Sequence, residues 1–570
     1  MAKHFILLLA PLSLSYCYAQ VNVEDYQGNW EGRLRSPNSF SFRITVESIN
    51  SGFYDLRLAN QEVSINKRLK STGDDSILTS IDKDTQLELQ FTDDRKKLFG
   101  FIKSGALMYH INLENTGDNQ FTGNWNPLMI DSLQSQSLFL TIESNEEGTF
   151  GAYPFFEDQR FSGVWSTDYR KEGDAILFRD FKTGMKFRGR LLKDQIQLAI
   201  LLIDTVISTT RLSRSEGDWK FGTANAYQSW SVETPPPLND GWITTNVRDA
   251  GIKPAPLVRM LDSIRTEKLP NTHSVLIAKE GELVFEAYFD GYRADIPHDL
   301  RSASKSISSA MIGIAIDDKI IESTDQELYD CLPKAYQYTK DSLKSRISVR
   351  DLLTMSSGLD VAGNASEGNY QAASQWLKTV LEAPMAYEPG SYTDYGSANP
   401  FLLGVCLNEH LKKPLELYMD QKLLSPLGIT NYIIQTEDTQ TTPYFGGGMH
   451  LTPRDMLKFG QLYLDDGQWK GKQIISQHWV EESFKKHVRL EDVMDRNQYG
   501  YQWWHNTYVI DNEEIESIEA RGAGGQYIFV IPRLKSVVVI TSGNFRNGRL
   551  LQQPEKIVEE YILPALKNKR

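Results

Sequence analysis

The sequence predicts two structural classes in one chain: an all-β, barrel-like N-terminal half, and then an α+β domain in which helices flank an antiparallel sheet. Between residues 24 and 214, short alternating polar and apolar runs are separated by turn-forming pairs such as Glu147-Gly148. After Pro235-Pro236-Pro237, hairpin patterns near both ends of the remaining sequence enclose a long helical middle. Strands contributed by both ends of a segment favour one antiparallel sheet.

The length and the first residues limit where this protein works. A chain of 570 residues is too long for a single core, and a net charge of −13 argues against a nucleic-acid-binding surface. Residues 1–19 are typical of a signal peptide: Lys3, then the apolar run Phe5 to Leu14, then Cys17-Tyr18-Ala19 as a cleavage site. We therefore expect a periplasmic or secreted protein without a transmembrane segment. Lipid attachment at Cys17 is disfavoured because Tyr16 is bulky.

The N-terminal half contains an internal repeat. The segment Gln27-Gly28-Asn29-Trp30 recurs as Thr122-Gly123-Asn124-Trp125, and Lys97 to Ile102 resembles Lys186 to Leu191. An offset of roughly ninety residues indicates two related β-units, forming either one large barrel or two small ones. This half either binds a ligand or partner, whose identity is unknown, or covers the second domain with Trp30 and Trp125 in its core. We favour the structural role because no catalytic pattern is present.

The second part of the chain extends from residue 240 to 570, after a proline-rich linker at 215–239 whose three consecutive prolines hold the backbone extended. Its predicted elements are a hairpin of His273–Lys279 with Leu283–Phe289, mostly helical structure from Ser302 to about Lys422, a strand pair of Gln526–Ile531 with Ser536–Thr541, and a closing helix at Pro554–Leu566.

The tetrad Ser302-Ala303-Ser304-Lys305 opens the predicted helical middle. Residues three apart lie on one face of a helix, so a lysine can take the proton of the serine hydroxyl and make it a nucleophile. The spacing alone is weak evidence, since Ser64-Lys67, Ser80-Lys83 and Ser483-Lys486 share it. The following apolar stripe distinguishes Ser302, because it buries this helix and desolvates Lys305.

Two later segments fit the same chemistry. A loop with Pro389-Gly390 leads to Tyr395, and a tyrosine beside a lysine can relay a proton to a leaving group. The second segment, Arg521-Gly522-Ala523-Gly524-Gly525-Gln526, enters an apolar strand. Glycines let the backbone approach a substrate closely, and the next N–H group can stabilise an oxyanion.

Six segments in order resemble the serine β-lactamase and penicillin-recognising superfamily, and most closely its class C-type esterase and 6-aminohexanoate-dimer hydrolase branch. The resemblance covers residues from about Asp240 to Leu566. Its most specific segments are Arg301–Ser306, Val349–Leu359, Gly446–Gly448, Leu451–Met456, Gly500–Trp504 and Gly524–Tyr527. Gly446–Gly448 also has a simpler interpretation, as a tight turn before a capped helix.

The resemblance implies a β-lactamase-like domain at 240–570 and assigns roles by position. Ser302 would be the acylated nucleophile, Lys305 the general base, Tyr395 the proton relay and Ser397 a substrate contact. The oxyanion hole would use backbone N–H groups of Ser302 and Gln526, next to Gly525. Neither a cofactor nor a metal is expected. Relatives that bind β-lactams or D-alanyl carboxylates carry lysine or histidine where this chain has Ala523, and a methyl group cannot pair with a carboxylate.

We therefore expect a serine hydrolase that cleaves a small ester or amide through an acyl-enzyme. The alternatives are a cell-wall D-amino-acid peptidase related to penicillin-binding proteins, and a non-catalytic binding protein on the same fold. The substrate, the ester or amide preference and the oligomeric state stay open. Three further interpretations concern individual residues. Cys406 is interpreted as a buried free thiol, with its pairing to Cys331 undetermined; His273 and His298 are interpreted as structural; and Trp503 and Trp504 as either cleft or core residues.

Overall fold

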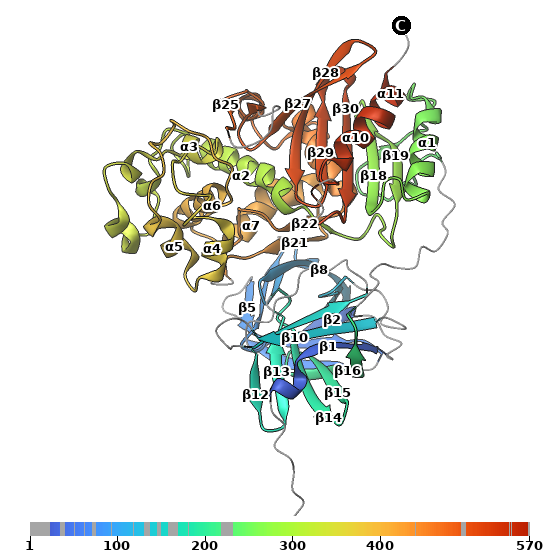
Figure 1. The fold of residues 1–570 in the computed structure, drawn as a ribbon, viewed down its shortest axis with the longest axis vertical. Helices are drawn as coiled ribbons and strands as arrows, with labels where there is room; N and C mark the ends of the chain where they lie inside the picture. The colour runs from blue at the N-terminus through green and yellow to red at the C-terminus, as the bar shows by residue number, and fades with distance from the viewer. Residues whose placement is uncertain are drawn as a thin grey trace, which may run out of the picture.

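The computed structural model describes residues 23–34, 40–50, 52–61, 63–70, 76–92, 94–117, 119–129, 137–144, 150–157, 169–180, 182–217, 232–438, 441–491, 498–545, 548 and 550–567. The expected signal peptide lies outside these residues. Figure 1 shows the β-rich N-terminal half below a larger C-terminal domain made of a helical lobe and a sheet lobe. Within the described ranges, no helix is both long and apolar enough to span a bilayer.

The N-terminal half is all-β, as predicted, and its strands belong to two curled sheets. The first sheet runs β5-β6-β7-β8-β9-β2-β3-β4, and the second runs β12-β13-β14-β15-β16-β1-β10-β11. Seven strands correspond in order, β5-β6-β7-β8-β9-β2-β3 with β12-β13-β14-β15-β16-β10-β11, and the repeated segments at Lys97 and Lys186 open the equivalent strands β7 and β14. The second order also contains β1, and β4 has no counterpart in it among the described residues. The bounds are β1 Gly28–Arg33, β2 Phe42–Asn50, β3 Phe53–Ala59, β4 Ser64–Lys70, β5 Ser76–Ser80, β6 Thr85–Phe91, β7 Lys97–Ser104, β8 Leu107–Gly117, β9 Gln120–Trp125, β10 Ser137–Ser144, β11 Phe150–Phe156, β12 Arg170–Glu172, β13 Ala175–Arg179, β14 Lys186–Leu192, β15 Gln195–Leu202 and β16 Thr205–Ser215.

The repeated tryptophans are core residues, as the structural interpretation of this half requires. Trp30 and Trp125 are both buried. The Trp30 indole N–H donates to the Tyr26 carbonyl at 2.7 Å, and the Arg214 guanidinium lies 4.3 Å from the centre of the Trp30 ring. A buried indole N–H group usually has such a partner.

The sheet lobe of the C-terminal domain is built from both ends of its sequence, as predicted. Its order is β17-β19-β18-β30-β29-β28-β27-β26-β25, antiparallel except where β17 runs parallel to β19. Helix α1 (Pro254–Arg265) and the closing segment pack together on one face of this sheet. Helix α8 (Pro453–Leu464) packs against strands β29 and β30. The strands are β17 Ile243–Thr244, β18 Thr272–Lys279, β19 Glu282–Tyr288, β25 Val488–Arg489, β26 Gln498–Tyr499, β27 Trp504–Ile510, β28 Glu513–Gly522, β29 Gln526–Ile531 and β30 Ser536–Ser542.

The closing segment is helical but not one regular α-helix. It comprises α10 (Gln553–Ile557), a π-helical turn at Val558–Ile562, and α11 (Leu563–Leu566). The helical lobe contains α2 Lys305–Asp317, α3 Val349–Leu353, α4 Glu367–Ala372, α5 Trp376–Glu382, α6 Ala398–His410 and α7 Leu415–Met419. Further short elements of the domain include α9 Gln477–Ser483 and the strand pair β23 Gln468–Trp469 and β24 Lys472–Gln473.

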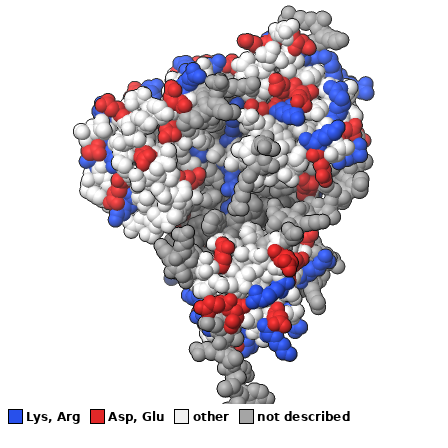
Figure 2. Space-filling model, viewed as in Figure 1, with Lys and Arg blue, Asp and Glu red and all other residues white. Residues whose placement is uncertain are grey.

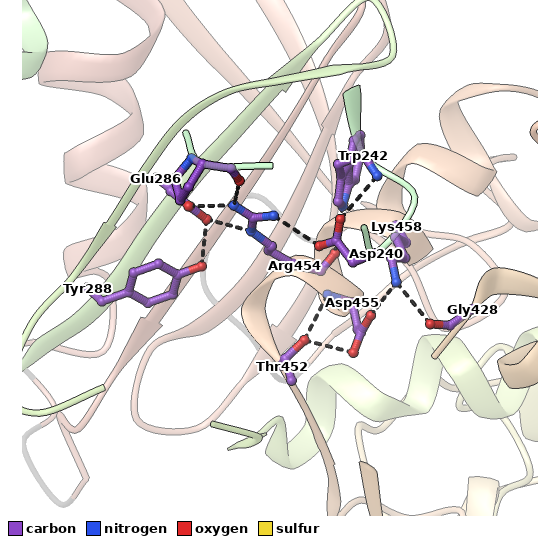
Figure 3. A network of polar contacts seen from close by, with 10 residues as sticks. Asp240, Trp242, Glu286, Tyr288, Gly428, Thr452, Arg454, Asp455 and Lys458 are labelled. Atoms are coloured by element: carbon purple, nitrogen blue, oxygen red, sulfur yellow. Dashed lines mark hydrogen bonds and ion pairs between the residues drawn. The ribbon is translucent and has the colours of Figure 1, made fainter. Parts of the chain in front are cut away.

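A buried polar network anchors the start of the C-terminal domain (Figure 3). The Arg454 guanidinium of α8 donates to both carboxylate oxygens of Glu286 at 2.7 and 2.6 Å, and to the Pro236 carbonyl at 2.8 Å. Asp240 lies 3.1 Å from the same guanidinium. Arg454 is almost fully buried, and these charges raise its pKa although burial opposes it. The network therefore ties the described end of the linker to β19 and α8.

Cys331 and Cys406 form a disulfide, so the interpretation of Cys406 as a free thiol is wrong. The sequence shows that Cys406 lies in an apolar run, but two cysteines 75 residues apart meet only because α6 packs beside the segment that carries Cys331. Both cysteines are buried. The bond thus cross-links the helical lobe beneath the surface.

Loss of this disulfide is expected to destabilise the protein by about 2–4 kcal/mol, because the bond restricts a long loop in the unfolded chain. The measurement is urea unfolding of the Cys331→Ala/Cys406→Ala variant. Wild-type protein unfolded in reducing urea should match the variant, and in oxidising urea it should be more stable. Equal stability of all three samples would show that the bond does not form.

Candidate active site

Ser302 lies in a 3₁₀ turn (Arg301–Ser304) that leads directly into α2, so the predicted position at a helix start is correct. Lys305, the first residue of α2, is 1 % exposed. Its Nζ donates to Ser302 Oγ at 3.0 Å, to Ser397 Oγ at 3.1 Å and to the Gly446 carbonyl. Three segments far apart in sequence therefore meet at one amine.

This arrangement suits proton transfer from the serine. An unprotonated amine has two N–H groups, which the Gly446 carbonyl and Ser397 Oγ can accept, and one lone pair, which then faces the Ser302 hydroxyl. A separation of 3.0 Å lies within hydrogen-bond reach of a general base. Ser397 touches the lysine directly, and its expected contact with substrate stays a prediction.

The other Ser-x-x-Lys tetrads have no such geometry. Ser64 and Lys67 both belong to strand β4, where residues three apart point to opposite faces of the sheet. Ser483 ends helix α9, so Lys486 lies beyond the helix. Only a helix start with a buried lysine brings the two side chains together, which is why context rather than spacing identified Ser302.

Tyr395 lies beside this pair, on the loop before α6. The Nζ of Lys305 is 5.4 Å from the centre of the Tyr395 ring. Tyr395 also packs against Trp504, with ring centres 5.2 Å apart. The structure thus brings Ser302, Lys305, Tyr395 and Ser397 together, while the relay role of Tyr395 stays a prediction.

Of the two adjacent tryptophans, Trp503 is a core residue and Trp504 lies at the site. Trp503 is fully buried and stacks on Phe459, with ring centres 5.9 Å apart, so it belongs to the core. Trp504 contacts Tyr395 and is therefore the one at the site.

The turn between β28 and β29 packs directly on Arg301–Ser304, which we call the nucleophile turn because it carries the predicted nucleophile Ser302. A side chain at Gly522 would collide with the Leu300 carbonyl, so only glycine permits this approach. Gly525 has φ +93°, and the Gln526 side chain is fixed by its amide N–H donating to the Ser542 carbonyl at 2.6 Å. These contacts hold the start of β29 beside Ser302, where the predicted oxyanion hole requires the Gln526 N–H group.

Gly446–Gly448 lie against the nucleophile turn rather than serving only as a turn. A Cβ at Gly447 would lie 3.9 Å from the Ser302 nitrogen, and Gly448 has φ +93°. The simpler expectation also holds in part, because Thr452 caps α8 by accepting from the Asp455 N–H group at 3.2 Å. The Gly446 carbonyl as a partner of Lys305 was not anticipated from the sequence, although the glycine run marked its location.

Ala523 is exposed at the tip of the β28–β29 turn. Arg521, the nearest cation in sequence, is engaged within the protein: its guanidinium lies 2.7 Å from the Glu519 carboxylate and 3.4 Å from Glu555. Burial alone would lower the pKa of Arg521, but nearby negative charges, of which Glu519 has the largest effect, raise it. Arg521 therefore neutralises buried carboxylates.

Figure 2 shows the surface hollowed between the helical lobe and the sheet lobe, with Lys and Arg side chains along the hollow. Arg301 comes directly before the nucleophile, and its side chain is 36 % exposed. Its guanidinium lies 5.0 Å from the centre of the Phe545 ring. A side chain at Gly524 would collide with that ring, so Arg301, Phe545 and the β28–β29 turn are neighbours.

His273, which is partly buried, and His298, which is buried, contact each other behind the nucleophile turn, as the structural interpretation expected. His273 Nδ1 and His298 Nε2 are 2.8 Å apart, and His298 Nδ1 lies 3.2 Å from the Asp299 carbonyl. Burial lowers the pKa of His298 to about 4 and that of His450, on the adjacent strand β22 (Met449–Leu451), to about 3. Both imidazoles are therefore neutral at pH 7.

These histidines predict acid lability. A histidine buried in its neutral form binds its proton more readily in the unfolded chain, so stability is present above pH 6.5 and is lost as the pH falls toward the folded value. At pH 4.5, each of these two histidines should lower the free energy of unfolding by about 2–3 kcal/mol. Urea unfolding at pH 7 and 4.5 measures this loss. His450→Gln should reduce it, and His478→Gln, at an exposed histidine, should not; equal losses in both variants would contradict the assignment.

Comparison with known proteins identifies the family of the C-terminal domain. The family model described as Beta-lactamase matches residues 271–559. This chain belongs to the beta-lactamase family. A relative, the 6-aminohexanoate-dimer hydrolase of Paenarthrobacter ureafaciens, is 26% identical over 325 residues, which cover 51% of this chain and 79% of the relative.

Solved structures similar to this chain include a mutant of simvastatin synthase from Aspergillus terreus, 16% identical, covering 55% of this chain and 98% of that one with a TM-score of 0.45. A penicillin-binding protein from Bacillus halodurans is 16% identical, with 51% and 97% coverage and a TM-score of 0.40. The predicted β-lactamase-like fold of the C-terminal domain is confirmed, and the chain is a member of a serine hydrolase family with hydrolases among its homologues.

Proposed function

We propose that this protein cleaves esters or amides through an acyl-enzyme on Ser302, outside the cytoplasm. One observation carries the proposal: the buried amine of Lys305 lies 3.0 Å from Ser302 Oγ. In the first step, Ser302 Oγ attacks the substrate carbonyl while Lys305 takes the hydroxyl proton. The N–H groups of Ser302 and Gln526 stabilise the oxyanion, and the proton passes through Tyr395 to the leaving alcohol or amine.

The second step releases the acid. Water attacks the acyl carbon, the bond to Ser302 Oγ breaks, and the proton returns to the serine. The family homologue that hydrolyses 6-aminohexanoate dimer supports hydrolysis as the outcome. The signal-like residues 1–19 and the Cys331–Cys406 disulfide support an oxidising, secreted or periplasmic location, because disulfides persist there.

Ala523 predicts the substrate preference. A cation that pairs with a substrate carboxylate is typically worth about 1.5–3 kcal/mol, and this chain has a methyl group at that position. We expect uncharged short-chain esters or amides to be hydrolysed about ten- to a hundredfold faster, in kcat/KM, than carboxylate-bearing β-lactams. The measurement is a panel of chromogenic esters, amides and nitrocefin with the purified mature protein.

The matched variant is Ala523→Lys, which should narrow the gap between nitrocefin and esters without raising ester hydrolysis. Efficient nitrocefin hydrolysis by the wild-type protein would contradict the proposed preference. It would assign carboxylate recognition to another cation, such as the half-exposed Arg301, and would favour the cell-wall peptidase alternative.

A further inference from the structure

The β-rich half continues into the sheet that carries the nucleophile turn. Strand β8 pairs antiparallel with β21 (Tyr432–Gln435), β21 pairs with β22, and β22 pairs with β20 (His298–Asp299), which ends three residues before Ser302. Figure 1 shows β8 lying directly beneath β21 and β22. Main-chain hydrogen bonds thus run without interruption from the N-terminal half to the residues before Ser302.

A lysine of the N-terminal half reaches the end of this sheet. Lys182 lies on the turn between β13 and β14, and its carbonyl accepts from the Ala106 N–H group at 2.9 Å. Its Nζ lies 3.5 Å from Asp299 Oδ2, and both side chains are only 11 % exposed. The turn is rigid, because the Asp180 carboxylate accepts from the N–H groups of Lys182 and Thr183 at 2.9 and 3.2 Å.

Asp299 in turn holds the residue before the nucleophile. Its Oδ1 accepts from the Arg301 N–H group at 3.0 Å, and its Oδ2 lies 3.1 Å from Arg301 Nε. Arg301 has φ +50°, a left-handed conformation that a long side chain adopts only when neighbours enforce it. The Asp299 carboxylate therefore fixes the backbone bend that aims the Ser302 N–H and hydroxyl groups.

We propose that Lys182 is a positioning residue for the hydrolase: it holds Asp299, which holds Arg301 in the bend that orients Ser302. The N-terminal half is then part of the working active site. The inference rests on the acyl-enzyme function proposed above, and it assigns this half a role that neither a passive cover nor a ligand-binding barrel would have.

The charges around Asp299 support the coupling. Burial alone would raise the pKa of this carboxyl group, yet Arg301, His450 and Lys182 hold it well below its usual range. His450 Nε2 is 3.9 Å from Oδ2 and is largely uncharged at pH 7, so Arg301 and Lys182 are the cations beside this carboxylate, although burial lowers the pKa of Lys182. Without Lys182, Asp299 is left in a buried site with one cation, and its carboxylate turns toward Arg301 and His450.

The test compares two lysines that cross the same interface. Lys182→Met removes the link to Asp299. Lys103→Met is the matched control, because Lys103 is also 11 % exposed in its side chain and forms ion pairs with Glu88 and, across the interface, with Glu416 of α7. None of the contacts of Ser302 or Lys305 described above involves Glu416. Both variants should lower the melting temperature.

The readouts are the rate of fluorophosphonate labelling of Ser302 and kcat for a neutral ester, both measured well below each variant's melting temperature. Lys182→Met should slow both about ten- to a hundredfold with little change in KM, since small displacements of a nucleophile reduce rates steeply. Lys103→Met should retain wild-type rates. Lys182→Arg should recover a large part of the wild-type rate, because it restores the positive charge. If Lys182→Met does not fold, Lys182→Gln replaces it in the comparison.

The double variant Lys182→Met/Asp299→Asn distinguishes positioning from general damage. If Lys182 acts through Asp299, the double variant is no slower than the slower single variant. The inference would be overturned if the rate reductions of the two single variants multiplied in the double variant. It would also be overturned if the Lys182→Met enzyme were labelled at the wild-type rate. Failure of the proposed function itself looks different: Ser302→Ala would then still be labelled, whatever residue 182 is.

Discussion

Replacing Ser302 with alanine is expected to abolish ester and amide hydrolysis and to eliminate covalent labelling by fluorophosphonates. The reason is that no acyl-enzyme can form without the hydroxyl group, while the fold should persist because the side chain is small and half-buried. Hydrolysis rates, labelling followed by mass spectrometry, and the melting temperature measure the three effects.

Ser64→Ala is the matched control for this variant, because Ser64 also has a lysine three residues later but lies on strand β4. It should leave labelling and hydrolysis at the wild-type level. If Ser302→Ala kept most of its activity, the nucleophile would be another residue. If wild-type protein were not labelled at all, the chain would be a non-catalytic binding protein on this fold.

Replacing Lys305 with alanine is expected to lower the acylation rate by about 10²–10⁴-fold, the usual effect of losing a general base. The loss can exceed this range, because the same amine also contacts Ser397 and the Gly446 carbonyl and so holds three segments together. Pre-steady-state release of the chromophore from an ester measures acylation separately from deacylation.

Lys67→Ala is the corresponding control, and it should have wild-type kinetics. Ser397→Ala should give a smaller decrease than Lys305→Ala, because it removes one acceptor of the amine and leaves the base in place. A Lys305→Ala enzyme that acylates within threefold of the wild-type rate would exclude this lysine as the base and would direct attention to Tyr395.

Local sequence signals were sufficient for much of the site. The tetrad at Ser302 predicts a helix start, because the apolar stripe that follows it has helical spacing, and the structure has α2 there. The glycines near Gln526 predict a close backbone approach, and Gly522 indeed packs on the nucleophile turn. Both signals are local: they depend on residues a few positions apart, whose conformation is set by backbone and side-chain sterics.

Partners that are distant in sequence could not be predicted in this way. The Gly446 carbonyl meets Lys305 from 141 residues away, and Cys331 meets Cys406 from 75. The apolar run around Cys406 indicates burial, but burial does not say which other buried residue lies alongside. That choice is made by how α6 packs in the helical lobe.

The sequence by itself determined the class of each half, the repeat in the first half, the family of the second and the serine–lysine pair that we propose as nucleophile and base. It did so because strand and helix periodicity, turn residues and short motifs are encoded within a few positions. Only the tertiary structure decided that β8 continues into β21, and that Lys182 reaches Asp299 beside Ser302. The physical reason is that an interface between two domains is stabilised by complementary edges and charges on both, and neither surface carries a sequence signal for the other.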